Sequence, residues 1–126
     1  MAKIVFESIA PQFVVPDVTR TAEWYRDNLG FEIQGYFFSE PPVYAIVRRG
    51  GILIHFGRSD SGETHSNTSI REMSIDAYLL VSNVVGLYDE LRGRGVEMPY
   101  PPTERVYGRT EIEVTDCDGH KIVFGE

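Results

Sequence analysis

The sequence of 126 residues contains a single cysteine, Cys117, and this scarcity excludes several kinds of site. An intrachain disulfide needs two cysteines, and the multi-cysteine zinc sites need more. Long apolar runs are missing too, because no stretch approaches the roughly 20 residues of a membrane-spanning helix. The first residues lack the apolar core of a signal peptide. We therefore expect a cytoplasmic protein with no disulfide and no membrane partner.

Basic residues are also few, with 12 Lys and Arg against 19 Asp and Glu and a net charge of −7. Nucleic-acid binders gain affinity by neutralising phosphates, so this balance argues against a nucleic-acid partner. It suits a cationic ligand, although acidic surfaces also serve solubility alone. The nucleophile elbow of hydrolases, the Gly-rich phosphate loop and the dinucleotide fingerprint are all absent from the sequence.

What the sequence does contain is a series of short apolar runs bounded by Gly, Pro, Asp or Asn, which is the pattern of strands. These runs are residues 13–15, 44–47, 52–54, 78–81 and 122–124. Two segments have a helical apolar period instead, each between a capping residue and a glycine. They are residues 18–29, between Asp17 and Gly30, and the segment from Val84, between Asn83 and Gly93 or Gly95.

The two halves of the chain resemble each other at a nearly constant offset. Asn83 follows Asp17 by 66 positions (83 − 17), and Gly119 opens a segment like the one at Gly51, 68 positions earlier (119 − 51). Such an offset indicates an internal duplication. We expect a single α+β domain of two tandem βαβββ modules, whose curved mixed sheet surrounds a cavity. Module 1 spans about 9–57, a polar linker spans 58–72, and module 2 spans about 73–126.

Four segments of the sequence have an order and spacing that resemble those of a known superfamily. They are Val15-Pro16-Asp17-Val18, residues 22–31, residues 107–111 and residues 116–120. Together they are similar to the vicinal oxygen chelate superfamily, which includes glyoxalases, dioxygenases and the fosfomycin- and bleomycin-resistance proteins. The resemblance covers about residues 9–124. The segments Ala10-Pro11 and Tyr107-Gly108-Arg109 are most similar to the bleomycin-resistance branch.

In metal-dependent members of that superfamily, the first and fourth strands of each module supply the metal ligands. The resemblance places these positions on Ala10, His55, Asp76 and Val123. Alanine and valine cannot coordinate a metal, and one His with one Asp falls short of the three protein ligands of a catalytic zinc site. We therefore expect no cofactor, with His55 and Asp76 as the candidate ligands if a metal is retained.

The incomplete ligand set favours a metal-free protein that binds a small molecule, as bleomycin-resistance proteins sequester an antibiotic in an aromatic-lined groove. Rings bind flat or cationic ligands, although aromatic residues on strands more often fill a core. Strand alternation turns His55 away from Ile54 and Phe56, toward the expected cavity. The candidate ligand-binding residues are His55, Asp76, Tyr36, Phe38, Phe56, Tyr107 and Arg109.

Several of these residues have a structural interpretation as well. His55 is equally well explained as a hydrogen-bonded strand residue, Arg109 as a solvated loop residue, and Asp76 rather better as the cap of a turn. Glu111 and Glu113 share one strand face, where they either meet a cationic ligand or face solvent. Solvent is the simpler explanation.

The resemblance also implies a homodimer, because Pro11 matches the point where relatives pass the first strand to the neighbouring subunit. The alternative function is a divergent metal-dependent lyase, isomerase or dioxygenase that keeps a metal through His55, Asp76 and a third ligand. A regulatory or carrier protein that uses the same cavity is a further option. Whether the protein is an enzyme stays open at this point.

Overall fold

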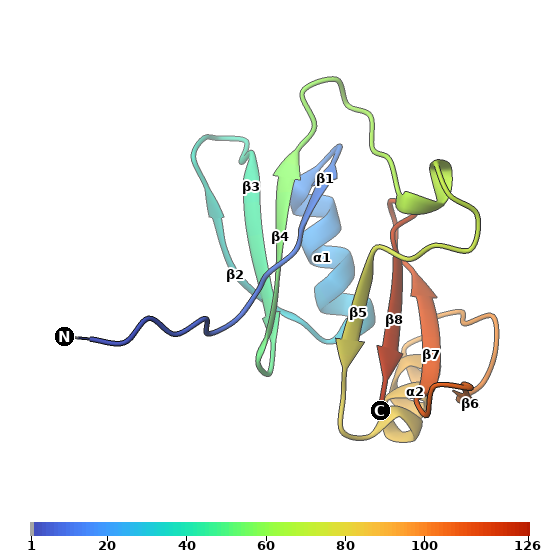
Figure 1. The fold of residues 1–126 in the computed structure, drawn as a ribbon. Helices are drawn as coiled ribbons and strands as arrows, with labels where there is room; N and C mark the ends of the chain where they lie inside the picture. The colour runs from blue at the N-terminus through green and yellow to red at the C-terminus, as the bar shows by residue number, and fades with distance from the viewer. Residues whose placement is uncertain (1) are drawn as a thin grey trace.

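The computed structural model describes residues 2–126, which form two successive βαβββ modules (Figure 1). Module 1 contains β1 (Gln12–Val15), α1 (Val18–Leu29), β2 (Glu32–Phe37), β3 (Tyr44–Arg49) and β4 (Ile52–Arg58). A connection with the short 3-10 helix η1 (Asn67–Ser69) leads to module 2. Module 2 contains β5 (Ala77–Leu80), α2 (Val84–Gly93), β6 (Thr103–Glu104), β7 (Thr110–Thr115) and β8 (Lys121–Gly125).

Each module builds its own four-stranded mixed sheet, with the same strand order in both. The orders are β1-β4-β3-β2 and β5-β8-β7-β6. The first and last strands of each module run parallel, and the remaining neighbours run antiparallel. A duplicated sequence predicts this equivalence, so the expected fold class is confirmed.

The predicted helices form where capping residues and apolar stripes coincide. The Asp17 carboxylate accepts hydrogen bonds from the backbone N–H groups of Thr19 and Arg20, both at 3.1 Å, and begins α1. Gly30 ends it with a φ of 70°, a left-handed conformation that favours glycine. The apolar stripe of α1 is buried: Val18, Ala22, Tyr25 and Leu29. Asn83 caps α2 in the same way, through the backbone N–H of Gly86.

The two modules meet through a shared core, and residues of both modules also line a cavity of about 770 Å³. Phe13 of β1 stacks on His120, at the start of β8, with ring centroids 4.5 Å apart. The Tyr25 hydroxyl of α1 donates to Asp116 at 2.5 Å, and Arg20 pairs with Asp118 at 2.9 Å. Buried residues of both modules therefore form one continuous hydrophobic core.

Asp116 is the centre of the polar contacts between the modules. Its side chain is fully buried and also accepts hydrogen bonds from the backbone N–H groups of Asp118 and His120, each at 2.9 Å. Burial opposes ionisation of Asp116, but His120, whose Nδ1 lies 3.5 Å from its Oδ2, and hydrogen bonds from Tyr25 and the backbone outweigh it, so its pKa is lowered. Burial likewise opposes protonation of His120, but Asp116 outweighs it and the pKa of His120 is raised.

The N-terminal segment leaves the body of the molecule. Residues 2–11 form no helix or strand, and Figure 1 shows them running away from the two modules. Three of their side chains are apolar and almost fully exposed: Ile4 at 90%, Phe6 at 98% and Ile9 at 92%. Such exposure is unfavourable in water. Within residues 2–126, neither helix has the length and apolar character needed to cross a membrane.

Candidate ligand-binding site

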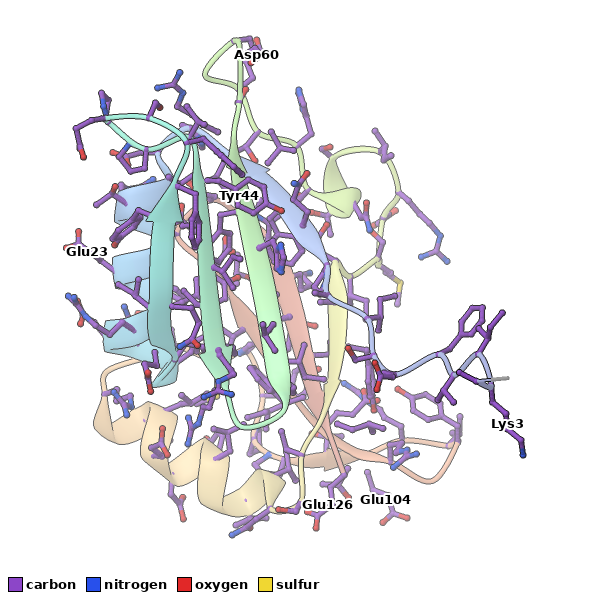
Figure 2. The ribbon with its side chains drawn as sticks, turned by 90° about the vertical axis from the view of Figure 1, so that its left-hand side faces the viewer. Lys3, Glu23, Tyr44, Asp60, Glu104 and Glu126 are labelled. Atoms are coloured by element: carbon purple, nitrogen blue, oxygen red, sulfur yellow. The ribbon has the colours of Figure 1, made fainter. Side chains whose placement is uncertain are left out.

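His55 faces away from the core, as the sequence predicts. Its neighbours Ile54 and Phe56 are fully buried, whereas His55 is half-buried on the opposite face of β4. Its ring Nδ1 lies 2.8 Å from the Tyr44 hydroxyl, which accepts a hydrogen bond from Gln12 Nε2 at 3.0 Å. Figure 2 shows Tyr44 on the sheet face turned to the viewer, with α1 behind the sheet.

Phe38 extends this group. Its ring meets Tyr44 edge to face with centroids 5.8 Å apart, and Tyr44 meets His55 in the same geometry at 5.6 Å. Phe38 is 82% exposed, so its ring is available to a ligand. We call Gln12, Phe38, Tyr44 and His55 the His55 cluster. A flat or cationic molecule can stack on these rings while bonding the histidine.

Two predicted ligand residues lie on the other side of the same sheet. Phe56 is fully buried against Tyr25, with ring centroids 5.0 Å apart, and its predicted role in ligand contact is corrected to core packing. Tyr36 pairs with Ala45, a buried residue on the helix-bearing face, so Tyr36 does not share the face of His55. A bulge between Ile33 and Gly35 shifts the register of β2 and causes this exchange.

Asp76 acts as the cap of a turn, the interpretation that the sequence favoured. One carboxylate oxygen accepts from the backbone N–H of Asn67 and the other from that of Lys121, both at 2.8 Å. Both carboxylate oxygens therefore accept backbone hydrogen bonds next to the start of β5. Within residues 2–126, the structure gives no hydrogen bond between the two candidate metal ligands, Asp76 and His55.

A second group lies on module 2, around a carboxylate that the sequence left as solvent-facing. Glu111 of β7 points away from the buried Ile112, as alternation predicts, yet it is only 3% exposed. Its carboxylate accepts hydrogen bonds from the hydroxyls of Tyr78 at 2.6 Å and of Tyr107, and from Arg105 Nε at 3.3 Å. We call Tyr78, Arg105, Tyr107 and Glu111 the Glu111 cluster.

The Glu111 cluster holds its carboxylate ionised. Burial opposes the charge, but the hydrogen bonds from Tyr107, Tyr78 and Arg105 outweigh it and lower the pKa of Glu111. Burial and the bond to Glu111 raise the pKa of Tyr78 to about 12. Tyr78 reaches Glu111 by lying across β8 at Gly125, where an added Cβ would overlap its hydroxyl. A glycine at this position thus permits the cluster to form.

Tyr107 and Arg109 occupy the turn between β6 and β7. Tyr107 belongs to the Glu111 cluster, although 64% of its surface is exposed. Arg109 is exposed and is close enough to Tyr78 to oppose the rise in its pKa. Both predicted residues are therefore placed beside Glu111 and not beside His55. No hydrogen bond joins the His55 cluster to the Glu111 cluster within the described part of the chain.

Two other features bear on chemistry. Among residues 2–126, no group of three or more His, Cys, Asp or Glu side chains could hold a metal ion. Burial and the nearby Asp118 and Asp116 raise the pKa of Cys117 to about 12, so this thiol is a poor nucleophile. Two cavities of about 770 and 620 Å³ lie elsewhere, and His55 and Glu111 line neither of them.

Sequence reasoning missed three contributors, Tyr44, Tyr78 and Arg105, and it considered Gln12 only as a metal ligand after a shift of register. Tyr44 and Tyr78 each open an apolar run, so the sequence predicts them only as strand residues. Only the pairing of β3 with β4 places Tyr44 beside the face of His55, and only the pairing of β5 with β8 places Tyr78 over Gly125. Gln12 and Tyr78 occupy equivalent positions of the two modules, 66 residues apart (78 − 12). This equivalence is the signal in the sequence that could have identified both residues.

Two tandem modules, each a sheet with a helix on one face, define the class of fold. Comparison of the sequence with known protein families identifies the family. The family model of the Glyoxalase/Bleomycin resistance protein/Dioxygenase superfamily matches residues 7–124. The chain therefore belongs to this superfamily. No curated protein shows significant similarity to the sequence.

Solved structures agree with this assignment. The bleomycin-binding protein of bleomycin-producing Streptomyces verticillus, complexed with copper(II)-bleomycin, is 25% identical, with a TM-score of 0.72 over 97% of each chain. The bleomycin resistance determinant of transposon Tn5 is 18% identical, with a TM-score of 0.73 over 96% of this chain and 98% of that chain. A glyoxalase-related enzyme from Clostridium phytofermentans is 14% identical, with a TM-score of 0.74 over 98% of this chain and 96% of that chain.

Proposed function

We propose that the protein is a metal-free cytoplasmic binder that sequesters a small organic cation of the bleomycin type and so confers resistance to it. The observation that carries this proposal is the Glu111 cluster, an ionised carboxylate held by two tyrosines and Arg105 on a sheet face outside the core. A buried carboxylate is costly to desolvate unless its partners are already in place. A site that keeps its charge and surrounds it with rings suits a cationic ligand.

The comparisons support this choice of ligand. The Streptomyces verticillus protein is complexed with copper(II)-bleomycin, and a second similar structure is a bleomycin-binding protein complexed with bleomycin, 20% identical with a TM-score of 0.71. The proposal of a metal-free site is supported by Asp76, because backbone N–H groups already bond both of its carboxylate oxygens.

The binding unit in this proposal is a homodimer. The exposed apolar side chains of residues 2–11 need a partner surface, and a second copy of the chain supplies one. The expected result is a dimer for the full chain and a monomer for a chain lacking residues 1–9, measured by sedimentation equilibrium. A monomeric full chain would contradict this part of the proposal.

Binding is tested by isothermal titration of the protein with metal-free bleomycin. We expect saturable binding that weakens with added salt. Glu111→Gln keeps the shape of the side chain and removes its charge, and it should weaken binding about tenfold or more, the effect of one hydrogen bond to a charged group.

Glu113→Gln is the matched control, because Glu113 lies two residues along the same face of β7 and pairs with Lys121 at 3.6 Å. Its affinity should stay within about twofold of the parent protein, as for surface ion pairs. The absence of saturable binding would refute the binder. Stoichiometric zinc, nickel, manganese or iron that is lost in His55→Ala would instead establish the metal-dependent enzyme.

A further inference from the structure

We infer that Tyr107 is an internal competitor for the Glu111 carboxylate, and that a ligand binds there by displacing the Tyr107 hydroxyl with its own N–H donor. This inference rests on the proposed function, because it concerns how the same site admits its ligand. The sequence predicts that Tyr107 contacts the ligand and strengthens its binding. In this inference Tyr107 competes with the ligand and weakens its binding.

Access to Glu111 requires one of its covering groups to move. The residue is 3% exposed, and its carboxylate oxygens are already bonded to Tyr78, Tyr107 and Arg105. A ligand therefore cannot reach the carboxylate without replacing one of these three donors. The question is which of them is held least firmly.

Two of the donors are fixed by more than the carboxylate. Tyr78 lies in β5, which pairs with β8, and its ring packs across Gly125. The Arg105 guanidinium stacks over the Tyr100 ring, 4.7 Å from its centroid. Removing either donor from Glu111 would disrupt packing as well as a hydrogen bond.

Tyr107 lacks comparable support. It is 64% exposed, and its neighbour Val106 is fully exposed at the tip of the turn. The turn has its own hydrogen bonds, from Gly108 N–H to the Arg105 carbonyl at 3.0 Å and from Arg105 N–H to the Arg109 carbonyl at 2.7 Å. The side chain can therefore rotate away while the turn stays folded. Aromatic side chains in exposed positions change rotamer within nanoseconds.

The surroundings indicate which ligand group takes its place. Glu111 is ionised, so the strongest replacement is a charged N–H donor such as an amidinium or ammonium. Aromatic rings adjoin the Glu111–Arg105 pair: the Tyr78 hydroxyl donates to Glu111, and the Tyr100 ring already holds one planar cation, the Arg105 guanidinium. An aromatic amidinium combines both features, and benzamidinium is the smallest probe that tests them.

The experiment is a titration of the protein with benzamidinium chloride, followed by the 13C signal of the Glu111 carboxyl, which Glu111→Gln identifies. Tyr107→Phe should bind benzamidinium about five- to tenfold more tightly, because the competing closed state is lost. Tyr78→Phe removes the hydrogen bond from the other tyrosine hydroxyl to Glu111, the one whose ring is fixed by packing. This variant should bind benzamidinium more weakly than the parent protein. Tyr36→Phe is the neutral control, since Tyr36 lies on the helix-bearing face.

Each outcome separates the inference from the proposed function. Tighter binding by Tyr107→Phe together with weaker binding by Tyr78→Phe supports the displacement. Weaker binding by Tyr107→Phe makes Tyr107 a direct ligand contact and overturns it. Bleomycin binding without any benzamidinium shift at Glu111 also overturns the inference while the binder stands. If neither probe binds to the parent protein or to Tyr107→Phe, both proposals fail.

Discussion

Asp116→Ala is expected to lower the free energy of unfolding by about 3–5 kcal/mol, the usual effect of removing one partner from a buried charged network. The substitution leaves the Tyr25 hydroxyl and the N–H groups of Asp118 and His120 without their acceptor. Because Tyr25 belongs to module 1 and Asp116 to module 2, the loss weakens the contact between modules. The measurement is urea unfolding at one fixed protein concentration, with the exposed Asp60→Ala as the control.

The pH profile of the same variant gives a second readout. The raised pKa of His120 contributes stability that is present below about pH 6.5 and lost as pH rises through the folded value. The lowered pKa of Asp116 contributes stability that is present above about pH 3.9 and lost as pH falls through its folded value. Asp116→Ala should therefore abolish the decline above pH 6.5. An unchanged decline would assign it to groups other than this pair.

Phe56→Ala is expected to destabilise the protein by about 3–5 kcal/mol, because it empties a fully buried aromatic site. The ring packs against Tyr25 and Phe13, at centroid distances of 5.0 and 6.3 Å. The same urea unfolding experiment measures the effect. This prediction follows from assigning Phe56 to the core instead of to the ligand.

Phe56→Leu separates the two assignments. It keeps the site apolar and filled, so the protein should stay folded and bind metal-free bleomycin with the affinity of the parent. His55→Ala, on the opposite face of the same strand, provides the comparison for a residue that is exposed to a ligand. Loss of affinity in Phe56→Leu at nearly unchanged stability would return Phe56 to the binding site.

The fold could be predicted because its signals are local and occur twice. Asp17 and Asn83 cap their helices, and the strand pattern repeats at a constant offset, so each half supports the interpretation of the other. His55 could be placed for the same reason: alternation over Ile54 and Phe56 needs no knowledge of the partner strand. Such features depend on the period of a strand or helix alone.

The site residues that could not be predicted depend on pairing between distant segments. The bulge in β2 moves Tyr36 to the helix-bearing face, and a single-residue shift of register reverses every side chain beyond it. The environment of Glu111 is set by Tyr78, 33 residues earlier. Alternation correctly gave the direction of Glu111, but it could not show that two tyrosines and an arginine shield the carboxylate from water.

The connection between the modules has a consequence for how the chain could be divided. Residues 59–66 and 70–76 form no helix or strand, whereas the modules hold each other through Phe13 on His120, Arg20 on Asp118 and Arg49 on Glu90. Covalent continuity through this connection therefore adds little to the contacts that join the halves. A chain cut there, or made as two polypeptides, retains every one of those contacts and can reassemble as a complementing pair of fragments.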